Sequence, residues 1–256
     1  MNSPTTRQQA FQSQFRASIA PGYSGVLHAV IIIATGLAAL AVCAWNIALP
    51  FTLRDLIAIP VVVVVWNFME WYVHLKVLHV PRKNKIARAL YTRHTLTHHQ
   101  FFTDADPTFK SARDLRIIFF PAFALPVVIL LAAPGAFLLG WVLSPNAGWL
   151  AIATTVLLYL IFEAFHFCAH LPDNSVVRNI PILNTMRRHH IAHHDQNLMM
   201  KYNLNFTLPL ADWFFNTSDL NRGLLGTIFN GNSIRHLNHS IRAPAQRPKN
   251  DPAEDG

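Results

Sequence analysis

Charged residues are scarce in this sequence. Asp, Glu, Lys and Arg make up 13% of its 256 residues, whereas a globular protein has roughly 25%. Hydrophobic residues account for 52% of the chain. This composition argues against an ordinary soluble domain and indicates an integral membrane protein. The net charge of +8 nevertheless requires a basic surface somewhere on the molecule.

Cysteine is also rare. The chain has two cysteines, Cys43 and Cys168, and both lie in apolar runs. Neither a disulfide framework nor a CxxC metal site can be built from them, so any bound metal must be held by nitrogen and oxygen. The sequence also lacks a glycine-rich nucleotide motif and any recognisable haem or iron–sulfur motif. Electrons for a redox reaction would therefore have to come from a separate protein.

Long apolar runs, by contrast, are plentiful. A helix that spans a membrane needs about 20 apolar residues. Four runs are long enough, near residues 25–49, 56–79, 115–133 and 147–170. The third run continues past the Pro134–Gly135 pair, and we expect this tail to be a short interfacial or re-entrant piece. The sequence thus predicts an all-α integral membrane protein with four transmembrane helices in two hairpins.

Polar segments frame this region. Residues 1–22 are polar, and the first apolar run is too long for the core of a signal peptide, so we expect no cleaved signal. Residues 221–256 form a polar, basic tail. The sequence therefore predicts a single membrane-embedded domain over residues 23–220, between two polar ends.

Lysine and arginine are distributed unevenly along the chain. Seven lie in the loop over residues 80–114, nine follow residue 170 and two lie in the first 22 residues, whereas the two remaining turns hold only Arg54. Loops rich in Lys and Arg stay in the cytoplasm. Both termini and the 80–114 loop are therefore predicted to be cytoplasmic.

Histidine is the most unusual feature of the sequence. Ten of the fourteen histidines fall into four clusters, with the spacings HX4H, HX3HH, HX3H and HX2HH. The clusters are His74 and His79; His94, His98 and His99; His166 and His170; and His190, His193 and His194. The last turns of the second and fourth spans should emerge at the cytoplasmic interface, so all four clusters are predicted in one histidine-rich cytoplasmic cap.

Crowded imidazoles need an agent that keeps them neutral. Two unit charges about 4 Å apart cost on the order of 4 kcal/mol at an effective dielectric near 20, and a metal ion is the usual reason for neutral, converging histidines. Ten ligands are too many for one ion, whereas two ions with about five nitrogens each make a dinuclear site. The sequence therefore predicts that all ten bind metal.

Helical spacing leaves two questions open. His166 and His170 lie four residues apart and share a helix face, but His74 and His79 lie five apart, about 140° around an α-helix. They either serve two different ions or the helix loosens before Pro81. His189 forms an HX3H pair with His193 yet stands outside the HX2HH pattern, so its role is also open.

Four carboxylates are candidates for a supporting role. Glu70 and Glu163 lie deep in apolar helices, where acidic side chains usually have a partner and a function. We expect them to accept N–H bonds from metal-bound histidines, with Asp195 and Asp212 as further candidates. Packing with neighbouring polar residues is the alternative.

The order of the four histidine clusters resembles the fatty acid hydroxylase superfamily, which includes sterol desaturases and fatty acid 2-hydroxylases. Residues 202–219, YNLNFTLPLADWFFNTSD, are similar to the stretch that follows the last cluster in that family. There the family has Gly-Thr, whereas this chain has Asn216-Thr217. The resemblance covers roughly residues 60 to 220. It implies a non-haem diiron membrane enzyme that uses O2, with the ten histidines as iron ligands.

The expected function follows from this resemblance. We expect a membrane-bound diiron oxygenase that hydroxylates or desaturates a lipid, such as a fatty acyl lipid, with electrons from an external reductase or small carrier that docks on the basic cytoplasmic face. No nucleic-acid partner is expected. A histidine-rich membrane metal transporter and a haem-binding cytochrome remain as alternatives. Transporters place their ligands near the bilayer midplane, whereas these histidines gather beyond one face.

Overall fold

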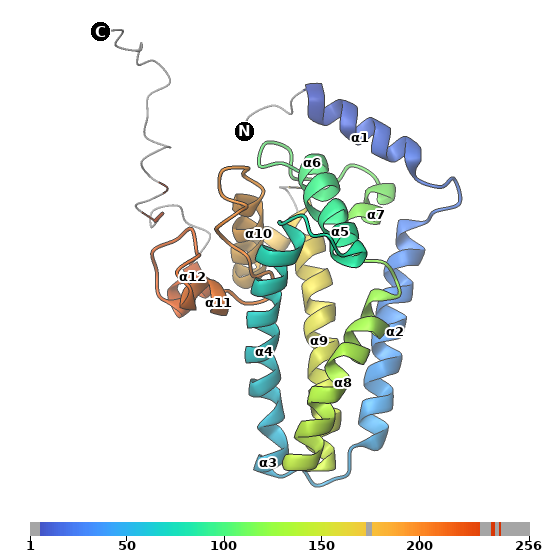
Figure 1. The fold of residues 1–256 in the computed structure, drawn as a ribbon, viewed down its shortest axis with the longest axis vertical. Helices are drawn as coiled ribbons and strands as arrows, with labels where there is room; N and C mark the ends of the chain where they lie inside the picture. The colour runs from blue at the N-terminus through green and yellow to red at the C-terminus, as the bar shows by residue number, and fades with distance from the viewer. Residues whose placement is uncertain (1–5, 173–175, 231–236, 239–240, 242–256) are drawn as a thin grey trace.

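The structure is a computed structural model, in which residues 6–172, 176–230, 237–238 and 241 are described. Four long helices run along its long axis, and shorter helices gather at one end (Figure 1). The long helices are α2 (Gly25–Asn46), α4 (Ala58–Val73), α8 (Ala124–Val142) and α9 (Pro145–Ala169). Pairing of extended backbone within the described residues is limited to an isolated bridge between Leu220 and Leu237. The prediction of an all-α protein is confirmed.

All four spans are long and apolar enough to cross a membrane. The second is composite, because the short helix α3 (Leu53–Leu56), α4 and the π-helix η1 (His74–Leu78) together form one span over Leu53–Leu78. Large apolar side chains face outward from the bundle: Phe137 is 78% exposed and Trp141 is 79% exposed. A broad apolar exterior of this kind suits lipid rather than water. The chain is a multi-pass membrane protein, as predicted.

The third span differs from the predicted range 115–133. Leu115–Ile118 form the short helix α7 beside the histidine-rich end, the chain breaks around Pro121, and the span is α8, which continues through Pro134. Proline removes one hydrogen bond from a helix, yet membrane helices tolerate it because neighbouring groups satisfy the freed carbonyl. The expected re-entrant tail after Pro134 is therefore wrong, since those residues form the second half of the span.

Helix α9 is the centre of the bundle. It packs against α2, α4 and α8, whereas α2 and α4 have little contact with each other (Figure 1). Helices α8 and α9 approach most closely at two glycines, where a Cβ added to Gly148 would lie 3.2 Å from the Cα of Gly140 and 3.0 Å from the carbonyl oxygen of Ala136. Small residues permit this closeness. The first two spans thus each use α9 as a partner rather than packing as a tight pair.

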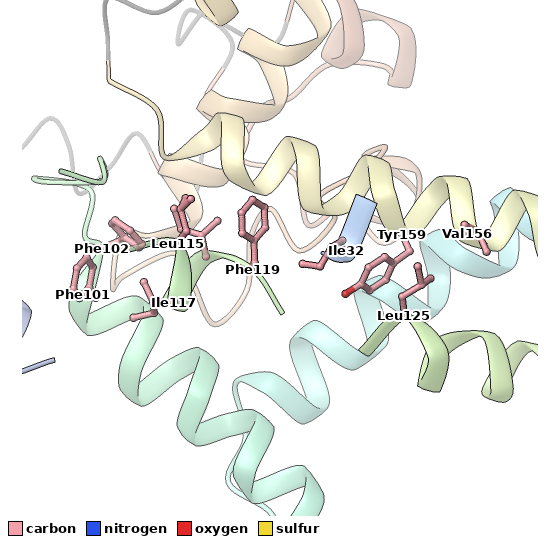
Figure 2. Close-up of a cluster of buried hydrophobic side chains, with 10 residues drawn as sticks. Ile32, Phe101, Phe102, Leu115, Ile117, Phe119, Leu125, Val156 and Tyr159 are labelled. Carbon is pink, nitrogen blue, oxygen red and sulfur yellow. The ribbon is translucent and has the colours of Figure 1, made fainter. Parts of the chain in front are cut away.

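A row of buried apolar side chains joins the bundle to the shorter helices. Figure 2 shows the row along α9, with Val156 and Leu125 at one end and Phe101 and Phe102 at the other. Ile32, Leu115, Ile117, Phe119 and Tyr159 complete its labelled members. Because these side chains come from both the spans and the histidine-rich end, their packing fixes the one against the other.

The shorter helices form a cap on one end of the bundle (Figure 1). The cap consists of α1 (Thr6–Ser18), α5 (Lys85–Tyr91), the π-helix η2 (Thr92–His98), α6 (His99–Phe101), η3 (Ala112–Asp114), α7, η4 (Val176–Asn179), α10 (Pro181–His193), α11 (Leu210–Phe214) and α12 (Leu224–Asn230). A helical cap that carries the histidines was expected. Its location in the cytoplasm stays a prediction, and most of the predicted basic tail over 221–256 lies outside the described residues.

The polar N-terminal segment packs onto this cap. Two glutamines of α1, Gln8 and Gln12, are buried and donate to the carbonyl oxygen of Phe101 at 3.0 and 2.9 Å. Arg16 forms a bidentate ion pair with buried Asp114 at 2.8 and 2.9 Å. These bonds tie α1 to the segment that follows the second histidine cluster.

Candidate metal centre

The predicted histidines converge in two buried groups. In each group, one ring nitrogen from every residue lies within 4.8 Å of all the others. The first group consists of His74, His79, His94, His99 and His193, and the second of His98, His166, His170 and His190. His194 is the tenth, and its Nε2 lies 3.0 Å from that of His190 and 3.2 Å from that of His98. The first group therefore consists of histidines from the first half of the chain together with His193. The second consists of histidines from the second half together with His98.

Two π-helical segments determine which histidines share a group. In an α-helix, His74 and His79 would point about 140° apart. The π-helix η1 widens the turn toward i→i+5 bonding, so both residues join the first group. In η2 the N–H of His99 bonds the carbonyl of His94, and this pair also joins the first group, whereas His98 joins the second. Of the two alternatives left open for His74 and His79, the structure shows the loosened helix.

The second half of the chain keeps ordinary α-helical spacing. His166 and His170 lie at the end of α9 and share the second group. His190 and His194 lie one turn apart at the end of α10. His193, between them, faces the first group instead. One regular helix end thus serves both groups.

In five rings, the partner of the outer nitrogen, Nδ1, shows which ring nitrogen carries the hydrogen. A backbone carbonyl can only accept, so a neutral imidazole beside one carries its hydrogen on that nitrogen, and its other nitrogen is a lone pair. A backbone carbonyl oxygen lies beside Nδ1 in four of the rings. The distances from Nδ1 to that oxygen are 2.6 Å for His74 and Leu204, 2.6 Å for His170 and Pro107, 2.8 Å for His193 and Tyr202, and 2.8 Å for His194 and Phe102. The Nδ1 of His79 lies 3.2 Å from the hydroxyl of Thr95, which itself donates to the carbonyl of Leu78.

The resulting arrangement suits a bound cation. The Nε2 of His79 lies 3.2 Å from that of His74 and 3.0 Å from that of His193. All three rings carry hydrogen on Nδ1, so lone pairs face one another here with no hydrogen between them. Metal–imidazole bonds of about 2.0–2.1 Å place neighbouring ligand nitrogens about 2.9–3.4 Å apart, for angles from 90° to tetrahedral. The observed spacing fits ligands that share an ion.

Burial keeps the rings in their metal-binding form. For the ligands outside the spans, burial is the largest cause that lowers the pKa from the ordinary value of 6.5, to about 3 for His79 and about 4 for His193. Neighbouring imidazoles lower it further for His79. Burial and then nearby imidazoles hold the pKa well below 6.5 for His94, His98, His99, His170, His190 and His194. Neutral imidazole is the form that binds a metal.

His189 lies outside both groups. Its Nε2 lies 3.1 Å from Oδ2 of Asp212, and its carbonyl accepts from the side chain of Asn203 at 3.0 Å. Both His189 and Asp212 are fully buried. The contact joins α10 to α11, so the HX2HH pattern, which leaves His189 out, agrees with the structure.

The carboxylates have different partners from those we predicted. Glu70 accepts from the backbone N–H groups of Phe206 and Thr207, at 2.9 and 3.2 Å, and from the side chains of Asn205 and Thr207, at 3.3 and 2.8 Å. Glu163 accepts from the hydroxyl of Tyr159 at 2.7 Å and the N–H of Phe120 at 3.1 Å. None of these bonds comes from a metal-group imidazole, so the expectation of direct bonds to the two glutamates is wrong. Backbone carbonyls lie at the outer nitrogens of four rings instead, those of His74, His170, His193 and His194.

The two aspartates differ in importance. Asp195 accepts from the N–H of Asn197 at 2.8 Å, near the surface. Asp212 accepts from the N–H groups of Leu204 and Asn205, at 3.0 and 2.8 Å, besides His189. Asp212 and Glu70 thus hold the same short segment from opposite sides, and this segment carries the carbonyl of Leu204 that orients His74. Their support for the metal centre is indirect.

Phe206 closes the centre and was not singled out from the sequence. Its ring centroid lies 4.9 Å from that of His74 in the first group, and 4.5 and 5.4 Å from those of His190 and His166 in the second. Phe162 of α9 packs on it at 4.9 Å. Phe206 therefore contacts both groups on the side where α9 enters the span. Its place in the YNLNF stretch was the available signal.

Asn216 accounts for the departure from the family pattern. Its φ is 53°, in the left-handed region that favours glycine and tolerates asparagine. The next residue, Thr217, donates its hydroxyl to Asp212 at 2.6 Å. Asparagine can therefore replace glycine here without changing the turn that delivers this bond.

Comparisons with known proteins agree with the geometry. A family model described as "Fatty acid hydroxylase" matches residues 59–217. The match covers well over half of the chain and includes all ten histidines, Glu70, Asp212 and Asn216. Neither a curated protein nor a solved structure matches the chain.

Proposed function

Because the chain belongs to the fatty acid hydroxylase family, we propose that it is a diiron oxygenase that hydroxylates or desaturates a membrane lipid. It would use O2 and electrons from an external donor. The observation that carries this proposal is the pair of buried histidine groups, each with its ring nitrogens within 4.8 Å of one another. A fatty acyl lipid is the substrate that we propose.

The donor set fits iron. Imidazole binds iron, zinc and copper alike, so the ligands allow iron without selecting it. Two bound irons would supply the redox chemistry for the activation of O2 toward an unreactive C–H bond, which no side chain can supply. All ten histidines would hold them. Zinc is redox-silent, and we would regard it as a substitute.

The protein's own contribution is to hold the ligands still and dry. Carbonyls of Leu204, Tyr202, Pro107 and Phe102 orient four of the rings, and ligands held in this way bind metal more tightly. The burial of every ligand keeps bulk water away from the centre. This shielding limits side reactions of any reactive species formed there.

The substrate would reach the centre from the membrane. The second group begins on α9, a spanning helix, and the buried rings of Phe162 and Phe206 pack together between the span and this group. An acyl chain arriving from the bilayer would displace these rings to reach the centre. Oxidation would then take place close to the lipid head group, at the level of the cap.

The electron donor would approach the opposite, outer side of the cap. We propose that the cap and both termini lie in the cytoplasm, as the distribution of lysine and arginine predicts. Exposed Lys83 lies on the loop that leads into α5, and exposed Lys85 is the first residue of that helix. A basic surface of this kind favours an acidic partner and accelerates its association.

The proposal is tested with the purified protein reconstituted in vesicles with a chemical or enzymatic reductant. We expect O2-dependent conversion of added fatty acyl lipid to a product 16 mass units heavier or 2 units lighter, measured by mass spectrometry. The variants His98→Ala and His193→Ala, one from each group, should abolish it. His28→Gln is the control, because His28 lies outside the groups and bonds Tyr23 and the carbonyl of Phe120. Metal uptake into vesicles without lipid oxidation would contradict the proposal and favour a transporter.

A further inference from the structure

A cavity lies away from the metal-group histidines. Its volume is about 860 Å³, within the range of roughly 300–1,000 Å³ that is typical of small-ligand sites. Residues 18–24, which link α1 to α2, form one wall, and residues 121–123, before α8, form another. None of the ten metal-group histidines lines it. The cavity is therefore separate from the metal centre.

Two arginines give the cavity a positive charge. Arg93 donates to the carbonyl oxygens of Arg116, at 3.1 Å, and of Phe119. The guanidinium of Arg116 lies 5.8 Å from the ring centre of Tyr23. Within the described part of the chain, neither arginine forms an ion pair with a carboxylate. Two neighbouring cations thus face one cavity with aromatic and carbonyl partners alone.

Burial makes this concentration of charge costly. Arg93 is partly buried, and it lines the same cavity as Arg116. A bound anion would relieve the repulsion between the two guanidinium groups. Guanidinium groups bind phosphate through paired, charge-assisted hydrogen bonds.

The cavity lies at the level where two spans begin. Helix α2 starts at Gly25 and α8 at Ala124, next to the two cavity walls. Three apolar side chains line the cavity and remain exposed: Leu27 at 58%, Ile31 at 42% and Phe123 at 68%. Leu27 and Ile31 lie one turn apart on α2 and continue the cavity into the span. The site thus combines a cationic end at the membrane boundary with an apolar side along the membrane.

We propose that this cavity binds an anionic phospholipid, with its phosphate at Arg93 and Arg116 and one acyl chain along Leu27, Ile31 and Phe123. Basic pockets between transmembrane helices are suited to such head groups. The proposal goes beyond the oxygenase function, because a lipid held here lies apart from the histidines. It would instead join the α1–α2 corner to the segment before α8.

The test measures lipid retention by the full-length protein in detergent. Native mass spectrometry would follow binding of dioleoyl phosphatidylglycerol, which is anionic, and dioleoyl phosphatidylcholine, which is zwitterionic. We expect the parent to retain the anionic lipid preferentially. Arg116→Gln should weaken that retention about five- to tenfold, because one surface cation and its paired bonds are lost. Arg116 is exposed and its side chain packs over Tyr23 at the surface, so the fold should persist.

Two further variants separate this site from general charge. Lys83→Gln removes the same charge from an exposed position in the cap and should leave retention unchanged. Leu27→Trp keeps both arginines but fills the apolar side of the cavity, and it should weaken retention as Arg116→Gln does. Metal content, measured on every variant, should stay at the parent value, which separates this proposal from the oxygenase function.

Three results would overturn the proposal. They are equal retention of the two lipids by the parent, an equal loss in Lys83→Gln and Arg116→Gln, and displacement of the lipid by an equal concentration of the soluble head group glycerophosphoglycerol. The last result would mean that the phosphate binds without any contribution from the acyl chain.

Discussion

Glu70→Gln should damage the metal centre although Glu70 touches no ligand. The carboxylate accepts four hydrogen bonds, two on each oxygen, from residues 205–207. A glutamine can keep the two backbone bonds on its remaining oxygen, but its NH2 group would then face the NH2 group of Asn205 at the 3.3 Å position. A lost bond and a buried donor facing another donor cost about 1–3 kcal/mol.

The effect should reach the first histidine group through a short path. The segment that Glu70 holds continues directly to Leu204, whose carbonyl accepts from Nδ1 of His74 at 2.6 Å. A shift of this carbonyl frees the ring of His74 and allows the wrong tautomer. Loss of such an orienting partner typically lowers metal affinity or activity 10- to 100-fold.

Glu163→Gln is the matched control. Oε1 of Glu163 accepts both strong bonds, from Tyr159 at 2.7 Å and from the N–H of Phe120 at 3.1 Å, and Oε2 adds only a 3.4 Å contact with the same N–H. A glutamine oxygen in the Oε1 position keeps both strong bonds. We therefore expect iron content per chain and the thermal midpoint in detergent to fall in Glu70→Gln and to stay near the parent values in Glu163→Gln. Full iron occupancy in Glu70→Gln, or equal damage in both variants, would refute this reasoning.

Three other variants or conditions test single contacts. His189→Asn should lower the thermal midpoint, since the 3.1 Å contact with Asp212 is lost, yet retain all iron; loss of an iron would make His189 a ligand. At Asn216, where φ is 53°, the Asn216→Gly variant should be as stable as the parent, whereas Asn216→Ala should lower the free energy of unfolding by about 1–2 kcal/mol. Equal thermal midpoints of these two variants would show that the left-handed backbone does not strain alanine. Acid should destabilise the fold, because the unfolded chain takes protons near pH 6.5 whereas His79 and His193 stay neutral until about pH 3 and 4 in the native state. The thermal midpoint should therefore fall as pH drops from about 6.5 toward 4, and a constant midpoint over that range would contradict the lowered pKa values.

The spans and the convergence of the ten histidines could be predicted from the sequence because composition and spacing determine them directly. A predominantly apolar run of 22 residues such as α2 has few alternatives to a membrane helix. Histidines crowded between basic residues have few uses besides metal binding. The third span was misplaced because Pro134 is a strong breaker in water but is tolerated inside a membrane helix.

The division of the histidines between the two groups could not be predicted in the same way. It depends on π-helical turns at His74 and Thr92, which add one residue per turn and leave no compositional mark. The acceptors that orient the rings were missed for a related reason. They are backbone carbonyls, as at Leu204 and Pro107, and a residue's identity says nothing about where its carbonyl points.

The central claim is that two histidine groups each hold one iron. The most direct test is the iron content per chain of protein purified from iron-supplemented cells, measured for the parent, for His79→Ala in the first group and for His170→Ala in the second. The account predicts two irons per parent chain and the loss of at least one in either variant, with the chain still inserted in the membrane. A parent that binds a single iron, or variants that both retain two, would contradict it.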